Sequence, residues 1–206
     1  MSESANGSGL REHLLVFSRF LRSPRTVGAV SASSRALANE IVHAVEFGSG
    51  IRIVELGPGT GALTVAIVER LTSHDRFLAV DIDPEFVKQI RQRWPSIECI
   101  CASAEDLVQI VEERGLWPLD HIVSGLPFTS LPVQMTDRIL ESVAGSLRPG
   151  GTFTTFQYVY AHSMPSASAF RRKMSERMRQ QPSKRLVVRN VPPAWILTWK
   201  KPADGA

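Results

Sequence analysis

The sequence has few cysteines and lacks a long apolar segment. Only two of its 206 residues are cysteine, Cys99 and Cys101, two positions apart on a predicted strand, which favours reduced thiols over a disulfide. No histidine, cysteine or acidic residues have the spacing of metal ligands, so we predict no metal site. No stretch reaches the ~18 apolar residues of a membrane span, and no segment has the profile of a secretion signal. We therefore expect a cytoplasmic protein, and these observations are compatible with its binding to a membrane surface.

Positive charge is concentrated in two short segments. The net charge of the chain is +4, yet residues 11–25 carry +3 and residues 171–189 carry +7, so the remainder is acidic. This asymmetry indicates an anionic partner, which could be a phospholipid surface, a nucleic acid or a phosphate-bearing substrate.

Strand and helix patterns alternate through most of the chain. We predict strands at 51–56, 77–81, 97–101, 121–124 and 152–160, and helices at 33–47, 61–71, 84–93, 105–113 and 132–147. The first of these helices would begin at a Ser33 or Ser34 cap, and the last would end at the RPGG sequence of residues 148–151. Such alternation predicts a Rossmann-like α/β fold with a mainly parallel sheet and helices on both faces. The tail, residues 184–200, predicts a hairpin that adds antiparallel pairing and completes seven strands.

The beginning of the chain predicts an amphipathic helix after a disordered start. Apolar residues recur from Leu10 to Leu21 beside arginines, and Pro24 ends the pattern. One interpretation is a helix in a membrane interface, with Leu14, Phe17, Phe20, Leu21, Arg19 and Arg22 facing the lipid. The alternative is a helix packed on the core with solvated arginines. We divide the chain into residues 1–30, which hold this segment, and a domain of residues 31–206.

A second amphipathic pattern lies in the later basic segment. Phe170, Met174 and Met178 recur every four residues among lysines and arginines. Three interpretations remain open: a second interfacial helix, a nucleic-acid-binding arm, or a solvated basic face.

The stretch IVELGPGTGALTVAI, residues 53–67, interrupts an apolar run with three glycines and a proline. The loop Gly57-Pro58-Gly59-Thr60-Gly61 follows a strand and opens a helix, where glycine lets the backbone approach a ligand closely. Glu55 ends the strand, and Asp81 ends the next one, at the position of an acid that binds ribose hydroxyls. No basic residue follows to meet a pyrophosphate. The pattern favours S-adenosylmethionine, which has an amino acid, a ribose and an adenine but no phosphate.

The segments VELGPGTGALT and AVDIDPEF resemble the first two motifs of class I S-adenosylmethionine-dependent methyltransferases. They are similar above all to bacterial phospholipid N-methyltransferases and rRNA adenine dimethyltransferases. The resemblance implies that Glu55 and Gly57 face the methionine amino group and that Asp81 binds the ribose. It also implies that Ile82 packs on the adenine. An acid usually meets the adenine amine where this chain has Ser103, so Ser103, Ala104 or Glu105 would supply that contact.

The loop after the fourth predicted strand bears on the methyl acceptor. In adenine N6-methyltransferases an Asn or Asp precedes a Pro/Leu-Pro-aromatic sequence, but here the sequence is Ser124-Gly125-Leu126-Pro127-Phe128. This departure opposes a nucleic-acid base. SGLPFTSLP, FLRSPRTVGAVSASSRALA, FQYVY and VRNVPPAWI are instead similar to segments of bacterial phospholipid N-methyltransferases.

The phospholipid resemblance implies further site residues at the end of the fifth strand. Tyr160, with Tyr158 beside it, would bind the lipid phosphate, Arg189 is a second candidate for that anion, and Phe128 would contact the headgroup. His162 is a candidate base for the headgroup ammonium. We therefore expect methylation of phosphatidylethanolamine at the inner face of the cytoplasmic membrane, with Ser124, Gly125 and Leu126 next to the cofactor. The resemblance implies no protein partner. An rRNA adenine methyltransferase and a non-catalytic cofactor-binding module are the alternatives.

Overall fold

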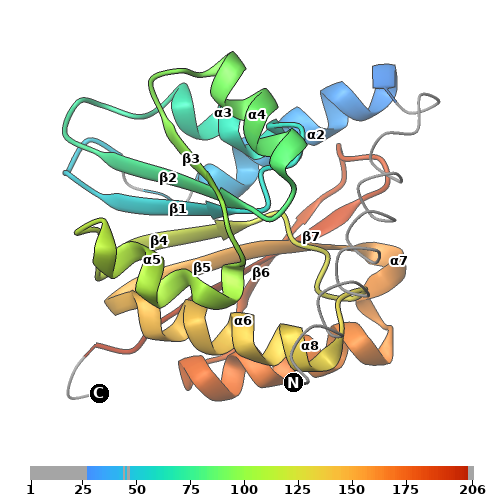
Figure 1. Cartoon of the computed structure of the whole chain (residues 1–206). Coiled ribbons are helices and arrows are strands. Elements are labelled where there is room, and N and C mark those ends of the chain that lie inside the picture. Colours follow the sequence, from blue (N-terminus) through green and yellow to red (C-terminus); the bar gives the residue numbers. More distant parts are fainter. Residues whose placement is uncertain (1–26, 44, 46, 204–206) are drawn as a thin grey trace, which may run out of the picture.

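A single seven-stranded sheet forms the centre of the molecule (Figure 1). The structure is a computed structural model that describes residues 27–43, 45 and 47–203. The sheet order is β3-β2-β1-β4-β5-β7-β6, in which the first five are parallel and β7 and β6 are antiparallel. The strands are β1 (Arg52–Leu56), β2 (Arg76–Asp81), β3 (Glu98–Cys101), β4 (Leu119–Ser124), β5 (Leu147–Tyr158), β6 (Ser183–Val187) and β7 (Ala194–Lys200). The predicted Rossmann-like sheet and its C-terminal antiparallel hairpin are confirmed.

Helices cover both faces of the sheet (Figure 1). One face packs against α2 (Val27–Val42), α3 (Ala62–Val68) and α4 (Pro84–Arg93). The other packs against α5 (Leu107–Glu113), which follows the short helix η2 (Ala104–Asp106), and against α6 (Val133–Ser146) and α8 (Pro165–Met178). The remaining helix, α7 (Val159–His162), is a single turn after β5.

Burial on both faces explains the apolar character of the parallel strands. In β1, Val54 and Leu56 join the core under α5 and α6, whereas Ile53 joins the core under α2 and α3. All three side chains are fully buried. A strand covered by helices on both sides needs a continuous apolar run, so the buried polar residue of β1, Glu55, stands out.

Three predicted boundaries were wrong. Helix α2 begins at Val27, so Ser33 and Ser34 lie inside it rather than at its cap. The RPGG sequence does not stand between a helix and a strand but lies within β5, which begins at Leu147. This strand ends at Tyr158, and Tyr160 belongs to α7 instead.

The apolar stripe of α8 lies in the protein core. Phe170, Met174 and Met178 are at most 2% exposed, and the ring of Phe170 stacks on that of Phe128 with 4.5 Å between centroids. The interpretation of this stripe as a membrane-interface helix was therefore wrong, because the apolar face is already covered. Much of its charge is neutralised by α6: Lys173 pairs with Asp137 at 2.7 Å, and Arg177 pairs with Glu141 at 3.2 Å.

The predicted helix over residues 10–23 lies outside the described residues, and with it the membrane-facing set from Leu14 to Arg22. Within the residues that the structure does describe, no helix combines the length and the apolar character needed to cross a membrane.

Candidate functional site

The strand order reverses direction between β1 and β4. The chain leaves β1 toward β2 and β3 on one side, while β4 and β5 lie on the other. Ligands of open α/β sheets bind at the carboxyl ends of strands at such a reversal. The residues at these carboxyl ends include Leu56, Asp81 and Ser124, the last two of which were predicted as site residues.

The glycine loop is held in a conformation that other residues adopt at a cost. Gly57, Gly59 and Gly61 all have positive φ, at 70°, 52° and 87°. A Cβ at Gly57 would lie 2.7 Å from a methyl carbon of Leu126, and one at Gly61 would lie 2.7 Å from the ring of Trp94. At position 57, both the positive φ and the lack of space for a side chain require glycine.

Glu55 is a buried acid with half of its carboxylate unpartnered. Its side chain is fully buried, and Oε2 accepts a 2.7 Å hydrogen bond from the Thr64 hydroxyl. The other oxygen, Oε1, is buried without a hydrogen-bond partner. Burial raises the pKa of Glu55 from 4.5 to about 8, and the negative charge of Asp81 adds to this effect. A cationic donor against Oε1 would satisfy the oxygen and favour the ionised form.

Asp81 connects the second strand to the glycine loop. Its Oδ2 accepts from the Gly59 amide at 3.1 Å, and its Oδ1 accepts from the Asp83 amide at 2.9 Å. Burial raises the pKa of Asp81, while these amides oppose the shift. Ionised oxygens retain further lone pairs for hydroxyl donors, so the position suits a sugar. Ile82 is half-buried directly after it.

Ser103 and Glu105 form a small network at the start of η2. The Ser103 hydroxyl accepts from the Glu105 amide and donates to Oε2 of Glu105, both at 3.2 Å. Arg138 pairs with the other Glu105 oxygen. The Ala102 amide donates to the backbone oxygen of Asp81 at 2.9 Å, which places this segment beside the ribose candidate. The predicted adenine-contact segment therefore adjoins Asp81 and Ile82.

The loop after β4 packs directly on the glycine loop. Gly125 donates to the backbone oxygen of Leu56 at 2.9 Å, and a Cβ on Gly125 would lie 2.8 Å from the oxygen of Gly57. The Ser124 hydroxyl is buried and accepts from the Leu126 amide at 3.2 Å. Ser124 thus holds the shape of the loop.

The ring of Phe128 lies in the core, 6% exposed and stacked on Phe170, whereas the sequence predicted a contact with the headgroup. A direct contact with substrate would need the loop to open, so its position in the structure is that of a packing residue.

A second polar group gathers at the carboxyl end of β5. Arg171 of α8 donates to Gln157 Oε1 at 2.7 Å and to the backbone oxygen of His162 at 2.9 Å, and it also contacts His162 Nδ1 at 3.3 Å. Burial first, and then the charges of Arg171 and Lys184, lower the pKa of His162. The charge of Arg171 disfavours a proton on this ring, because two like charges would then lie side by side. These effects make His162 a weaker base, which opposes its predicted role as the base for the headgroup ammonium.

The two tyrosines lie side by side beyond this cluster. Their rings stack with centroids 5.6 Å apart; Tyr160 is 66% exposed, and Tyr158 packs against the core under α2. Burial raises the pKa of Tyr158. Arg189 is exposed in the turn between β6 and β7, which adjoins α7 because Val159 donates to the backbone oxygen of Pro193 at 2.9 Å. Tyr158, Tyr160 and Arg189 therefore share one end of the sheet.

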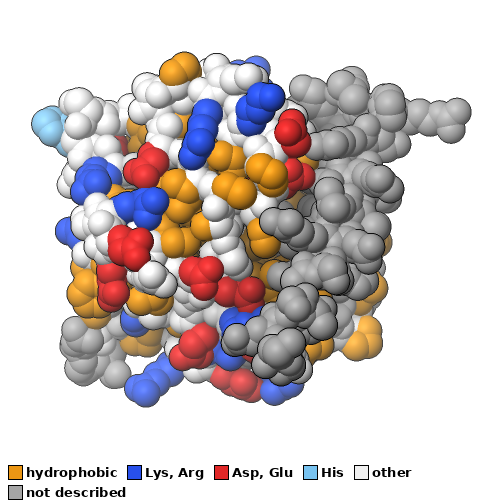
Figure 2. All heavy atoms as spheres, in the orientation of Figure 1, with side chains coloured by type: hydrophobic (Ala, Val, Ile, Leu, Met, Phe, Trp, Pro, Cys, Tyr) orange, Lys and Arg blue, Asp and Glu red, His pale blue; other side chains and the backbone are white. Residues whose placement is uncertain are grey.

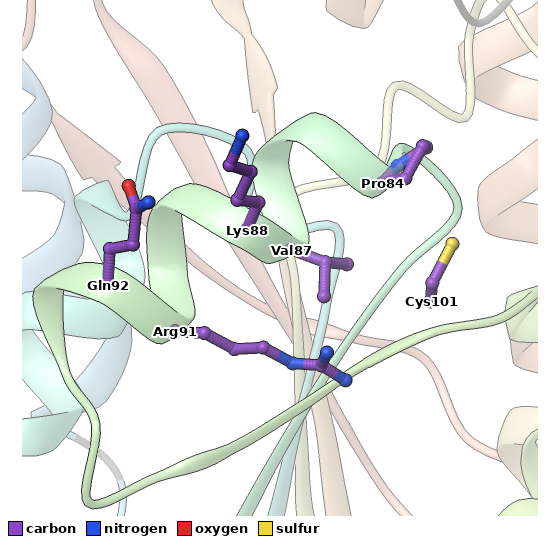
Figure 3. Close-up of a pocket in the computed structure, with 6 residues that line it drawn as sticks. All are labelled: Pro84, Val87, Lys88, Arg91, Gln92 and Cys101. Carbon is purple, nitrogen blue, oxygen red and sulfur yellow. The ribbon is translucent and has the colours of Figure 1, made fainter.

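The hollow in Figure 3 lies at the opposite side of the sheet, between α4 and β3, and is lined by Pro84, Val87, Lys88, Arg91, Gln92 and Cys101. On this face some hydrophobic side chains reach the surface among scattered charges (Figure 2). Cys101 is exposed at the end of β3, with its sulfur 3.6 Å from the backbone oxygen of Ile82. The hollow thus adjoins the predicted adenine side without including the glycine loop.

Comparison with known proteins identifies the family of the central part of the chain. Residues 53–151 match a protein-family model described as a methyltransferase domain. These residues are a methyltransferase domain. The chain is 29% identical to an ornithine lipid N-methyltransferase of Singulisphaera acidiphila over 157 residues, which are 73% of this chain and 82% of that protein.

Other relatives of the methyltransferase domain modify different molecules. The ribosomal RNA small subunit methyltransferase A of Synechococcus elongatus is 29% identical over 115 residues, 55% of this chain, but the match spans only 40% of that protein. A solved structure with a similar fold is the 1,6-didemethyltoxoflavin-N1-methyltransferase of Burkholderia thailandensis, bound to S-adenosylhomocysteine. Its TM-score is 0.64 at 15% identity, with 98% of this chain and 93% of that one covered. The match extends the methyltransferase fold over nearly the whole chain.

The predicted cofactor fits the residues of the domain. The methyltransferase domain uses S-adenosylmethionine as its methyl donor, and the solved structures share the fold of this chain. The unpartnered Oε1 of Glu55 suits an amino group, and the Asp81 carboxylate suits a ribose. The glycine loop brings the backbone close to both.

Sequence reasoning missed three contributors. Thr64 binds Glu55, Trp94 lies against Gly61, and Arg171 organises the end of β5. Thr64 had a signal, because a threonine on the first turn after a glycine loop can reach back to the strand. Trp94 and Arg171 lie 33 and 14 residues from their partners, Gly61 and Gln157, and nothing local marks such contacts.

Proposed function

We propose that this enzyme transfers methyl groups from S-adenosylmethionine to the headgroup amine of phosphatidylethanolamine and of its mono- and dimethyl forms. In this proposal it acts at the inner face of the cytoplasmic membrane, where the lipid is presented. The observation that carries a lipid acceptor is the likeness to a lipid N-methyltransferase over 82% of that relative's length. The match to an rRNA methyltransferase spans less than half of the relative.

The loop after β4 supports the same acceptor. A base-directed loop offers an amide or carboxylate to an exocyclic amine, but the corresponding residue here is Ser124, whose hydroxyl accepts a bond within its own loop. Ser124 therefore offers neither an amide nor a carboxylate to the exocyclic amine of a base. A lipid amine can instead be held through its phosphate, for which Tyr160 and Arg189 are the exposed candidates.

The chemistry needs positioning more than acid or base groups. Bound S-adenosylmethionine supplies an activated methyl group for in-line displacement. Glu55, the glycine loop and Asp81 would hold the cofactor, and the loop from Ser124 to Phe128 would close over it and exclude water. The acceptor amine must be neutral to attack. Because burial and the charge of Arg171 lower the pKa of His162, we propose that the amine loses its proton to water before it enters.

The test is to incubate the purified chain with labelled S-adenosylmethionine and three acceptors: phosphatidylethanolamine vesicles, ornithine lipid vesicles and rRNA. We expect label in phosphatidylethanolamine. Label in ornithine lipid alone would keep a lipid N-methyltransferase but change its headgroup. Label in rRNA alone would support the second candidate, an adenine methyltransferase, which the rRNA relative favours. Label nowhere would favour a non-catalytic module.

A further inference from the structure

Exposed apolar side chains gather in one part of the described surface. Eight large hydrophobic residues of the described chain are exposed, and six of them come from two short segments. Val159, Tyr160 and Met164 belong to α7 and the residues after it, whereas Leu186, Val188 and Val191 belong to the end of β6 and the following turn. Val188 and Val191 are 66% and 68% exposed. Apolar clusters of this kind mark contact sites more often than scattered single residues do.

These two segments are neighbours in space. Tyr158, the last residue of β5, pairs with Ala194, the first residue of β7, and Val159 donates to the backbone oxygen of Pro193. The β6–β7 turn and α7 therefore lie together at the carboxyl end of β5 (Figure 1). The glycine loop opens at the same edge, because β1 and β5 are both parallel to β4.

The charge of the two segments has one sign. Residues 158–168 and 183–193 contain no aspartate or glutamate, and they carry Lys184, Arg185 and Arg189. Arg185 pairs with Glu40 of α2 at 2.9 Å. Arg189 is exposed between Val188 and Val191, so a cation stands in the middle of the apolar tip. Apolar tips flanked by cations match an anionic bilayer, in which the apolar groups enter the acyl boundary and the cations meet phosphates.

We propose that α7 and the β6–β7 turn form a docking face for an anionic phospholipid membrane, with Val188 and Val191 inserted and Arg189 on a lipid phosphate. Its biological meaning rests on the proposed lipid methylation, although the contact itself does not. Docking in this way turns the carboxyl edge of the sheet toward the bilayer. A lipid headgroup then reaches the methyl-transfer edge without leaving the membrane.

The test replaces the inserted side chains without adding charge. Vesicle binding is measured by sedimentation of the full chain with vesicles of phosphatidylglycerol and phosphatidylethanolamine, for the wild type, V188S/V191S and V188I/V191I. Trp117→Ser is the control, because Trp117 is half exposed but lies just before β4, at the opposite edge of the sheet. We expect V188S/V191S to weaken binding about tenfold or more, whereas V188I/V191I and W117S bind as the wild type does.

A second measurement separates this proposal from the proposed function. Methylation of vesicle phosphatidylethanolamine should fall with binding in V188S/V191S, while methylation of a dispersed short-chain phosphatidylethanolamine should stay within twofold of the wild type. Equal vesicle binding by V188S/V191S and the wild type would overturn the docking face. Lost vesicle binding in V188S/V191S would uphold the face even if no form of phosphatidylethanolamine were methylated, and that result would overturn only the proposed function.

Discussion

At the carboxyl ends of β1, β2 and β4, the charged groups that we assign to the cofactor are buried and fixed by the structure. Glu55 is bound by Thr64, and Asp81 is bound by two loop amides. At the end of β5 and in the β6–β7 turn, the side chains that we assign to the acceptor, Tyr160 and Arg189, are exposed. The first half can hold a small charged ligand in one orientation. The second half lies on the surface, where a larger partner can reach it.

We call the carboxyl ends of β1, β2 and β4 with the glycine loop the cofactor half, and the end of β5 with the β6–β7 turn the acceptor half. The largest expected effect lies in the cofactor half. Gly57→Ala places a Cβ 2.7 Å from Leu126 on a backbone with φ of 70°, so the loop must move. We expect affinity for S-adenosylmethionine to fall roughly a hundredfold in calorimetric titration. Gly115→Ala is the matched control, because Gly115 has φ of 60° but its Cβ would meet nothing within 4 Å. Equal loss in both variants would mean that backbone strain alone, and not the shape of the loop, causes the defect.

The next effect concerns Glu55 and has a pH signature. Its pKa of about 8 before binding means that an amino group must displace a proton below that pH. Wild-type affinity for the cofactor should therefore rise between pH 5.5 and 7.5, by up to about tenfold per pH unit. Glu55→Gln should bind roughly thirtyfold more weakly at pH 7.5 and show no such slope. A slope that persists in the variant would assign the proton to another group.

The same carboxyl predicts a pH dependence for the cofactor-free fold, which gives a control for the titration. Its pKa is higher in the folded chain than in the unfolded chain, so the folded state holds the proton over a wider range. The stabilisation that the proton provides is present below about pH 4.5 and is lost as pH rises to about 8. Thermal melting of Glu55→Gln should lack this loss, relative to the wild type.

A smaller effect is expected in the acceptor half. Tyr160→Phe keeps the ring that stacks on Tyr158 and removes only the hydroxyl. We expect about a tenfold loss in kcat/KM for the lipid, the value of a hydrogen bond to a charged group, with cofactor affinity unchanged. A loss of cofactor affinity would break the division between the halves.

The smallest expected effect is that of Arg189→Ala. One exposed cation near an anionic surface contributes ~1 kcal/mol, which is about a fivefold change in vesicle binding. The difference from the wild type should shrink as salt rises from low to physiological concentration, because exposed charges are screened. A salt-independent difference would indicate a contact other than one between charges.

Much of the cofactor half could be predicted because its signals are local. A strand, a glycine loop and a helix are consecutive, and Asp81 ends the very next strand, so the pattern predicts that Glu55, the loop and Asp81 lie close together. The acceptor half depends on contacts between distant segments. The stripe of Phe170, Met174 and Met178 showed that α8 has an apolar face, but a periodic pattern does not say whether the protein core or a membrane covers it.

The turn at the end of β5 was missed for a related reason. Val159 and Tyr160 continue the β-type composition of the strand, but Val159 already bonds to Pro193 of the hairpin turn, and the chain turns into α7. A partner 34 residues away decides the end of the strand, and local composition does not reveal it.

The place of β7 has a consequence for how the molecule is assembled. This strand follows all others in sequence, yet it lies between β5 and β6, and β6 has β7 as its one neighbour in the sheet. Strand β6 is therefore joined to the rest of the sheet only through β7, which itself pairs with β5 across residues 159–193. A strand held on one side opens more readily than one held on both, so we expect β6 and the turn after it to be the first part of the sheet to open.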